Sequence, residues 1–113
     1  MENIKDIAKD FIADAIDAAK FDERKFASWH EFVEDAFSEA TANNVLPCYD
    51  NDDVAFGVLS DNRIIVGEFL DSLGFTPSVN PFLNPTGFLV YIVSAFAEDM
   101  GDAYADEFAE IHA

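Results

Sequence analysis

Ten consecutive residues near the end of the chain, residues 88–97, are mostly apolar and carry no charged side chain. Asn84 and Pro85 precede this run, and these residue types favour the N-cap and the first position of a helix. We therefore predict one long helix over residues 84–113. Because its first half is apolar on all sides, we expect that half to be buried on most of its surface and the rest of the chain to pack around it.

The second half of this predicted helix separates apolar from acidic residues. Apolar side chains recur at the spacing of one helical face: Met100, Ala103, Tyr104, Phe108 and Ile111. Carboxylates follow the same steps on the other side: Asp99, Asp102, Asp106 and Glu110. The pattern predicts a central helix with an acidic outer end.

The N-terminal segment repeats this separation. Residues 3–20 are predicted to form an amphipathic helix with the apolar face Ile4, Ile7, Ala8, Phe11, Ile12, Ala15, Ile16 and Ala19. Four carboxylates run down its opposite side: Asp6, Asp10, Asp14 and Asp17.

Further helices are expected in the middle of the chain. Ser28 and Glu31 have the spacing of a capping box, which predicts a second helix that ends at Asn43 and Asn44. Its inner face would be Trp29, Phe32, Val33, Ala36, Phe37 and Ala40, with Glu34 and Asp35 outside. The apolar connector, residues 45–49, is expected to pack on the core.

A short acidic helix and a further apolar helix should follow. The first begins in the acids Asp50, Asp52 and Asp53. Acids also suit a helix N-terminus because their negative charge is attracted to the positive end of the helix dipole. The second would be capped by Asp61 or Asn62 and end at Gly74, before an ordered proline-containing loop over residues 75–83. Together these segments predict one all-α domain, residues 1–113, with about five helices and an acidic outer surface.

Charge narrows the range of partners. The chain has 23 acidic and 6 basic residues, a net charge of -17, which argues against nucleic acid or an anionic membrane as a ligand and favours a basic protein.

Half of the residues are apolar, so we do not expect disorder. Cys48 is the only cysteine, which fits a reducing cytoplasm. The apolar run is too short to span a bilayer, and no signal peptide is apparent.

Catalytic and cofactor motifs find little support. Nothing in the spacing pairs Cys48 with His30 as a nucleophilic site. An EF-hand loop starting in the Asp50 cluster would place Ala55 at the position that requires glycine. Asp71 and Ser72 resemble a carrier-protein attachment site, but here the serine closes a helix rather than opening one. We expect no enzyme, no cofactor and no metal.

The acidic surface is therefore the main functional signal. Carboxylates four residues apart on a helix repel each other, and few basic residues offset them. Duplex DNA carries about one charge per 1.7 Å, so seventeen charges correspond to roughly 29 Å, or 8 to 9 base pairs. The charge count permits DNA mimicry. The alternative is a solvated exterior that maintains solubility or adapts the protein to high salt.

One stretch adds a family likeness. The segment from Trp29 to Leu59 is similar to the Ocr-like antirestriction proteins of phages; the matching residues are Trp29, His30, Glu31, Ala40, Asn43, Asn44, Val45, Pro47, Tyr49 and Asp53. The resemblance implies an all-helical homodimer shaped and charged like bent duplex DNA. Such proteins occupy the DNA site of type I restriction–modification enzymes and related defence systems.

These observations give a leading hypothesis and two rivals. The leading one is a phage-type inhibitor in the bacterial cytoplasm whose carboxylates replace phosphates at the DNA site of a host defence enzyme: Asp6, Asp10, Asp14, Asp17, Glu34, Asp35, Asp50, Asp52, Asp53, Asp99, Asp102, Asp106 and Glu110. The first rival is an acidic interaction module, such as an antitoxin, anti-CRISPR protein or assembly adaptor, that binds a basic partner without mimicking DNA. The second is a metal enzyme that uses the Asp50 cluster.

Overall fold

A computed structural model describes residues 3–73 and 83–113, and within these ranges the chain forms seven helices and no β-strand. The all-α prediction is confirmed, with more and shorter helices than the five expected. In chain order the helices are α1 (Ile4–Phe21), α2 (Trp29–Ala36), α3 (Ser38–Asn43), α4 (Asp52–Asp61), α5 (Arg63–Leu73), α6 (Pro85–Glu98) and α7 (Ala105–Ala109).

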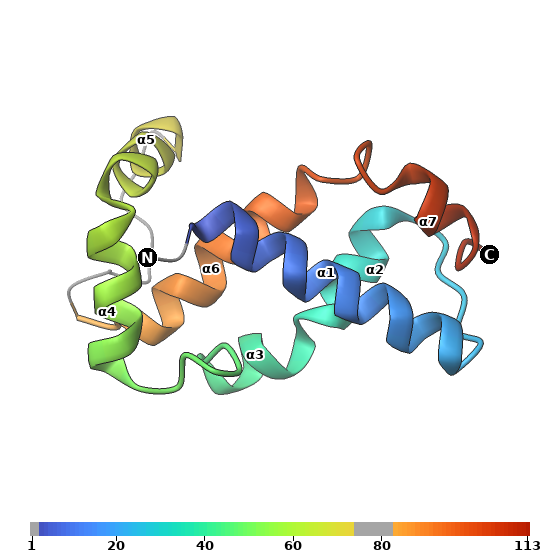
Figure 1. The fold of residues 1–113 in the computed structure, drawn as a ribbon, viewed down its shortest axis with the longest axis horizontal. Coiled ribbons are helices and arrows are strands. Elements are labelled where there is room, and N and C mark those ends of the chain that lie inside the picture. Colours follow the sequence, from blue (N-terminus) through green and yellow to red (C-terminus); the bar gives the residue numbers. More distant parts are fainter. Residues whose placement is uncertain (1–2, 74–82) are drawn as a thin grey trace.

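Helix α6 lies at the centre of the molecule. Figure 1 shows α1 crossing it near its middle and α4 lying across its N-terminal end. The Asn84 side chain accepts a hydrogen bond from the Gly87 N–H at 3.1 Å, and Pro85 occupies the first turn, so the predicted helix start is confirmed. The apolar run is also buried as predicted, with Phe88 and Ile92 fully enclosed.

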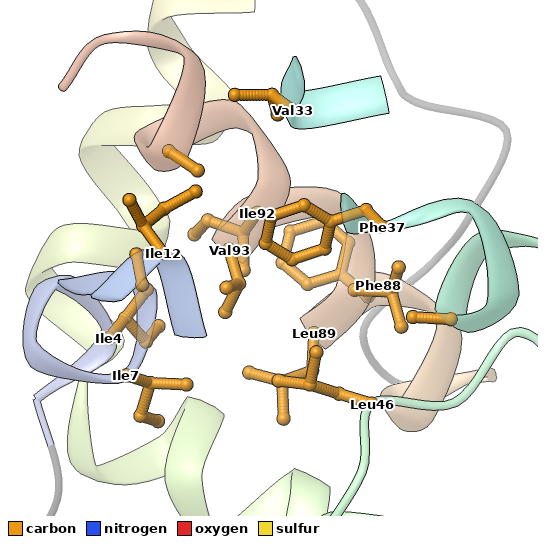
Figure 2. Close-up of a cluster of buried hydrophobic side chains, with 14 of the residues drawn as sticks. Ile4, Ile7, Ile12, Val33, Phe37, Leu46, Phe88, Leu89, Ile92 and Val93 are labelled. Atoms are coloured by element: carbon orange, nitrogen blue, oxygen red, sulfur yellow. The ribbon is translucent and has the colours of Figure 1, made fainter. Parts of the chain in front are cut away.

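The buried side chains form one cluster between α1, α6 and the middle of the chain. In Figure 2, Ile4 and Ile12 of α1 approach α6 from one side, and Phe37 and Leu46 lie on the other. Each fully buried side chain of this size contributes about 1.5–3 kcal/mol through removal of its apolar surface from water. The predicted apolar face of α1 is confirmed, and Leu46 shows that the 45–49 connector packs on the core.

The prediction of one helix through residues 84–113 is wrong. Helix α6 ends at Glu98, residues 99–104 form turns, and α7 spans only Ala105–Ala109. Local sequence contributes to the break. Glycine at position 101 has a low helix propensity, and the acids around Asp99 are repelled by the negative end of the helix dipole.

A distant side chain completes this break. The indole N–H of Trp29 donates to the Ala97 carbonyl at 2.9 Å, close to the C-terminus of α6. A β-carbon on Gly101 would lie only 3.1 Å from Cδ1 of Trp29, so the turn packs directly on the indole. Tyr104 stacks on the same ring with centroids 6.1 Å apart and planes 9° apart. The turn therefore wraps around Trp29, which a continuous helix would not do.

The second predicted helix is also divided. It begins as expected, because the Ser28 hydroxyl accepts the Glu31 N–H at 3.1 Å. It is interrupted at Phe37, whose buried ring stacks on Phe11 of α1 with centroids 4.3 Å apart. Helix α3 then ends at Asn43, and the C-cap residue Asn44 adopts a left-handed conformation with φ 54°. Asparagine tolerates that conformation better than most residues.

Two remaining expectations concern helix ends. Helix α4 starts where expected: Asn51 caps it by accepting the Asp53 N–H at 2.7 Å, and Asp52 and Asp53 lie in its first turn. The Asn62 side chain, at the junction of α4 and α5, accepts the Ile4 N–H at 3.2 Å and thereby ties this junction to the start of α1. The predicted cap at Gly74 and residues 75–82 of the predicted loop lie outside the described residues.

Candidate acidic interaction surface

All thirteen carboxylates chosen from the sequence are exposed to solvent. On α1 this follows from packing, because burial of the apolar face against α6 turns Asp6, Asp10, Asp14 and Asp17 outward. Among the described acidic residues of the whole chain, only Glu98 is partly buried. On α1 the helical periodicity therefore placed these side chains correctly with respect to the core.

Three of the thirteen are engaged in ion pairs. Glu110 pairs with Lys20, Asp35 lies 2.8 Å from the Arg24 guanidinium, and Glu34 lies 3.0 Å from His30. Within the described ranges the other ten form no ion pair: Asp6, Asp10, Asp14, Asp17, Asp50, Asp52, Asp53, Asp99, Asp102 and Asp106.

Two acids of the C-terminal segment, Glu107 and Glu110, lie near side chains of α1 or of residues that contact it. The Tyr104 hydroxyl donates to the Lys9 carbonyl at 3.4 Å, which places the turn after α6 against the middle of α1. Partial burial raises the pKa of the Tyr104 phenol, and the negative charges of Glu107 and Asp10 raise it further. Carboxylates from the two ends of the sequence thus act on one phenol.

The same neighbourhood extends to the end of α1. The hydrogen bond to Glu110 raises the pKa of the Lys20 ammonium, and the charges of Glu110, Asp17 and Glu107 raise it further. In return, Lys20 lowers the pKa of Glu110. One lysine is therefore surrounded by acids of α1 and of the C-terminal segment, and the local charge stays negative.

The Asp50 cluster lies elsewhere. It stands at the start of α4, and Figure 1 shows α4 and α7 at opposite ends of the long axis. The thirteen carboxylates thus form no single patch but are distributed along the molecule. In residues 3–73 and 83–113, no three His, Cys, Asp or Glu side chains are grouped closely enough to hold a metal ion.

His30 joins two helices through two carboxylates. Its Nδ1 lies 2.7 Å from Oε1 of Glu98, at the end of α6, and its Nε2 lies 3.0 Å from Oε1 of Glu34 on its own helix. The hydrogen bond and charge of Glu98, followed by the charge of Glu34, raise the pKa of the imidazole. Because residues 30 and 98 are distant in sequence, spacing alone could not reveal this pairing.

This arrangement predicts a pH-dependent contribution to stability. A raised folded-state pKa means that protonated His30 stabilises the fold fully below the unfolded-state pKa of about 6.5, and that this stabilisation disappears as pH rises through the higher folded-state value. We expect His30→Gln to lower the melting temperature at pH 5.5 more than at pH 9. Thermal unfolding of both proteins across this range measures the difference, and a constant difference would contradict the role of charge.

Sequence reasoning missed a groove beside α1. It has a volume of about 630 Å³ and lies between α1, the α2–α3 segment and residues 46–49. Its lining combines apolar side chains, including Phe11 and Tyr49, with the carboxylates Asp10, Asp14, Asp35 and Glu39. The groove depends on three separate segments, so no local pattern indicates it.

Comparison of the chain with protein-family models, with curated proteins and with solved structures found no match. None of the helices in the described ranges is both long and apolar enough to cross a membrane.

Proposed function

We propose that this protein is a non-enzymatic DNA mimic that inhibits a bacterial DNA-binding defence enzyme, most simply a type I restriction–modification enzyme. The observation that carries the proposal is the distribution of exposed carboxylates without ion-pair partners over a helical body 39 Å long. Duplex DNA of that length carries about 23 phosphate charges. The chain carries 23 acidic residues and a net charge of -17, so its charge per unit length approaches that of DNA.

Rigid spacing supports the same conclusion. Asp6 and Asp17 are separated by eleven residues of one helix, which corresponds to about 16.5 Å at the usual helical rise. That distance equals the axial rise of about five base pairs. Because the carboxylates stand on a packed helix, little conformational freedom is lost when a row of Lys and Arg side chains binds them. A DNA-binding groove offers such a row.

Competition with duplex DNA tests the proposal. Tagged protein is used to capture partners from a bacterial lysate, and the bound fraction is eluted with a short duplex or with salt. We expect duplex to release a DNA-binding restriction or defence enzyme, and binding to weaken as salt rises because exposed charges are screened within about 8 Å. A retained partner that duplex does not displace would contradict mimicry.

A second candidate function has its own structural support. Two large apolar side chains, Ile64 on α5 and Leu83 before α6, are 72% and 85% exposed. A partner that covered either side chain would remove its apolar surface from water. An acidic interaction module would bind its basic partner through such contacts, with charge mainly accelerating association. Salt-insensitive binding that is lost in Ile64→Ser would favour this function.

A further inference from the structure

The groove beside α1 is lined by partly buried apolar side chains, here called its floor, and by exposed carboxylates, here called its rim. Phe11 and Ala15 of α1 contribute to the floor from one side, and Ala36 and Tyr49 from the other. These four side chains are only partly buried, although they pack against the core. The floor therefore keeps apolar surface in contact with water, which an apolar side chain of a partner would cover.

The rim carries a negative charge that the protein itself leaves unbalanced. Asp10 and Asp14 stand on the α1 side, and Asp35 and Glu39 on the α2–α3 side. The basic residue at the groove is Arg24, whose guanidinium already lies 2.8 Å from Asp35 and 3.8 Å from Asp22. In the part of the chain that the structure describes, Asp10, Asp14 and Glu39 form no ion pair.

We propose that this groove binds a short segment of a basic partner protein in which one or two apolar side chains are flanked by Lys or Arg. The apolar side chains would contact Phe11 and Tyr49, and the cations would reach the carboxylates on both rims. The inference rests on the proposed function only in requiring a basic partner. It adds a contact that depends on shape and apolar burial, which a phosphate-like charge pattern alone does not provide.

Charge also excludes the other simple occupants. A second copy of this chain would bring another net charge of -17 to an acidic rim. Nucleic acid would bring phosphates to the same carboxylates, which repel them. A cationic segment complements the charge of the rim. One or two apolar side chains within that segment would complement the apolar floor.

The test uses two synthetic peptides and the single cysteine as a reporter. One peptide places four lysines around a central Leu-Phe pair, and the other replaces that pair with two serines. Cys48 is exposed and lines the groove, so occupancy should slow its reaction with a thiol reagent. We expect the Leu-Phe peptide to slow the reaction saturably and to bind at least about tenfold more tightly, by calorimetry, than the serine peptide.

Three variants separate the groove from general electrostatic attraction. Ala18→Phe, at an exposed position in the lining, should fill the groove, so that the peptide no longer slows the reaction of Cys48 with the thiol reagent. Asp14→Asn with Glu39→Gln should weaken peptide binding by about two- to thirtyfold. The control, Asp61→Asn with Glu68→Gln, removes the same charge from exposed sites that neither line the groove nor belong to the thirteen carboxylates, and it should change binding less than twofold.

Equal binding of both peptides, or equal loss in the groove variant and the control, would overturn the proposal. Circular dichroism of each variant excludes misfolding as the cause of lost binding. The two proposals can fail separately. If the peptide binds but no duplex-displaceable enzyme is captured, the groove proposal stands and the DNA-mimic proposal is rejected. If such an enzyme is captured but the peptide does not bind, the DNA-mimic proposal stands and the groove proposal is rejected.

Discussion

Replacing Asp6, Asp17, Asp102 and Asp106 together with asparagine should weaken binding to the proposed DNA-binding target by roughly 5- to 1000-fold. All four are exposed, form no ion pair in the described ranges and do not line the groove. An exposed ion pair contributes about 0.2–1 kcal/mol, so four lost contacts weaken binding by about 1–4 kcal/mol. Each single replacement should cost no more than about fivefold, which distinguishes a distributed charge surface from one essential site.

A matched control removes the same charge from acids outside the predicted set. Glu31→Gln, Asp61→Asn, Glu68→Gln and Asp71→Asn also change four exposed carboxylates. Calorimetric titration at several salt concentrations measures both variants, and the first should show the shallower salt dependence because it releases fewer counterions. A single carboxylate that removed most of the affinity, or equal losses in the two quadruple variants, would contradict distributed mimicry.

Local periodicity was sufficient wherever a helix packs one face on the core. The apolar steps of α1 predicted both its buried side and the exposure of Asp6 and Asp17, because a helix that buries one stripe must turn the opposite one outward. The starts of α2 and α6 were also predictable. Ser28 and Asn84 supply side-chain acceptors within three residues of the N–H groups that they satisfy.

Contacts between distant segments account for what the sequence did not reveal. The continuous C-terminal helix was wrong because Trp29, some seventy residues earlier, binds the end of α6 and receives the turn around Gly101. The His30–Glu98 pair and the groove beside α1 are missed for the same reason. Each arises only when helices cross at particular positions, and no spacing along one segment encodes that crossing.

Trp29 is therefore the residue whose removal should alter the C-terminal segment most. Besides its hydrogen bond to Ala97 and its stacking on Tyr104, its ring meets Phe108 of α7 edge-on, with centroids 5.5 Å apart and planes 84° apart. We expect Trp29→Ala to lower the free energy of unfolding by about 3 kcal/mol, the low end for a large aromatic because Trp29 is only partly buried. Trp29→Phe, which keeps a ring but loses the donor, should cost about 0.5–1.5 kcal/mol.

The position of the loss matters as much as its size. Helix α7 has five residues and none of them is buried, so its order depends on aromatic contacts such as that between Phe108 and Trp29 rather than on helix propensity. Hydrogen exchange in Trp29→Ala should accelerate across residues 99–113 well before the α1–α6 core opens, whereas Phe21→Ala, at a side chain 88% exposed, should change neither stability nor exchange. Uniform acceleration throughout the chain would show that Trp29 supports the whole core. Selective acceleration would show that one indole orders the segment that carries Asp102, Asp106 and Glu110, and binding to the proposed target should then fall without the loss of a single charge.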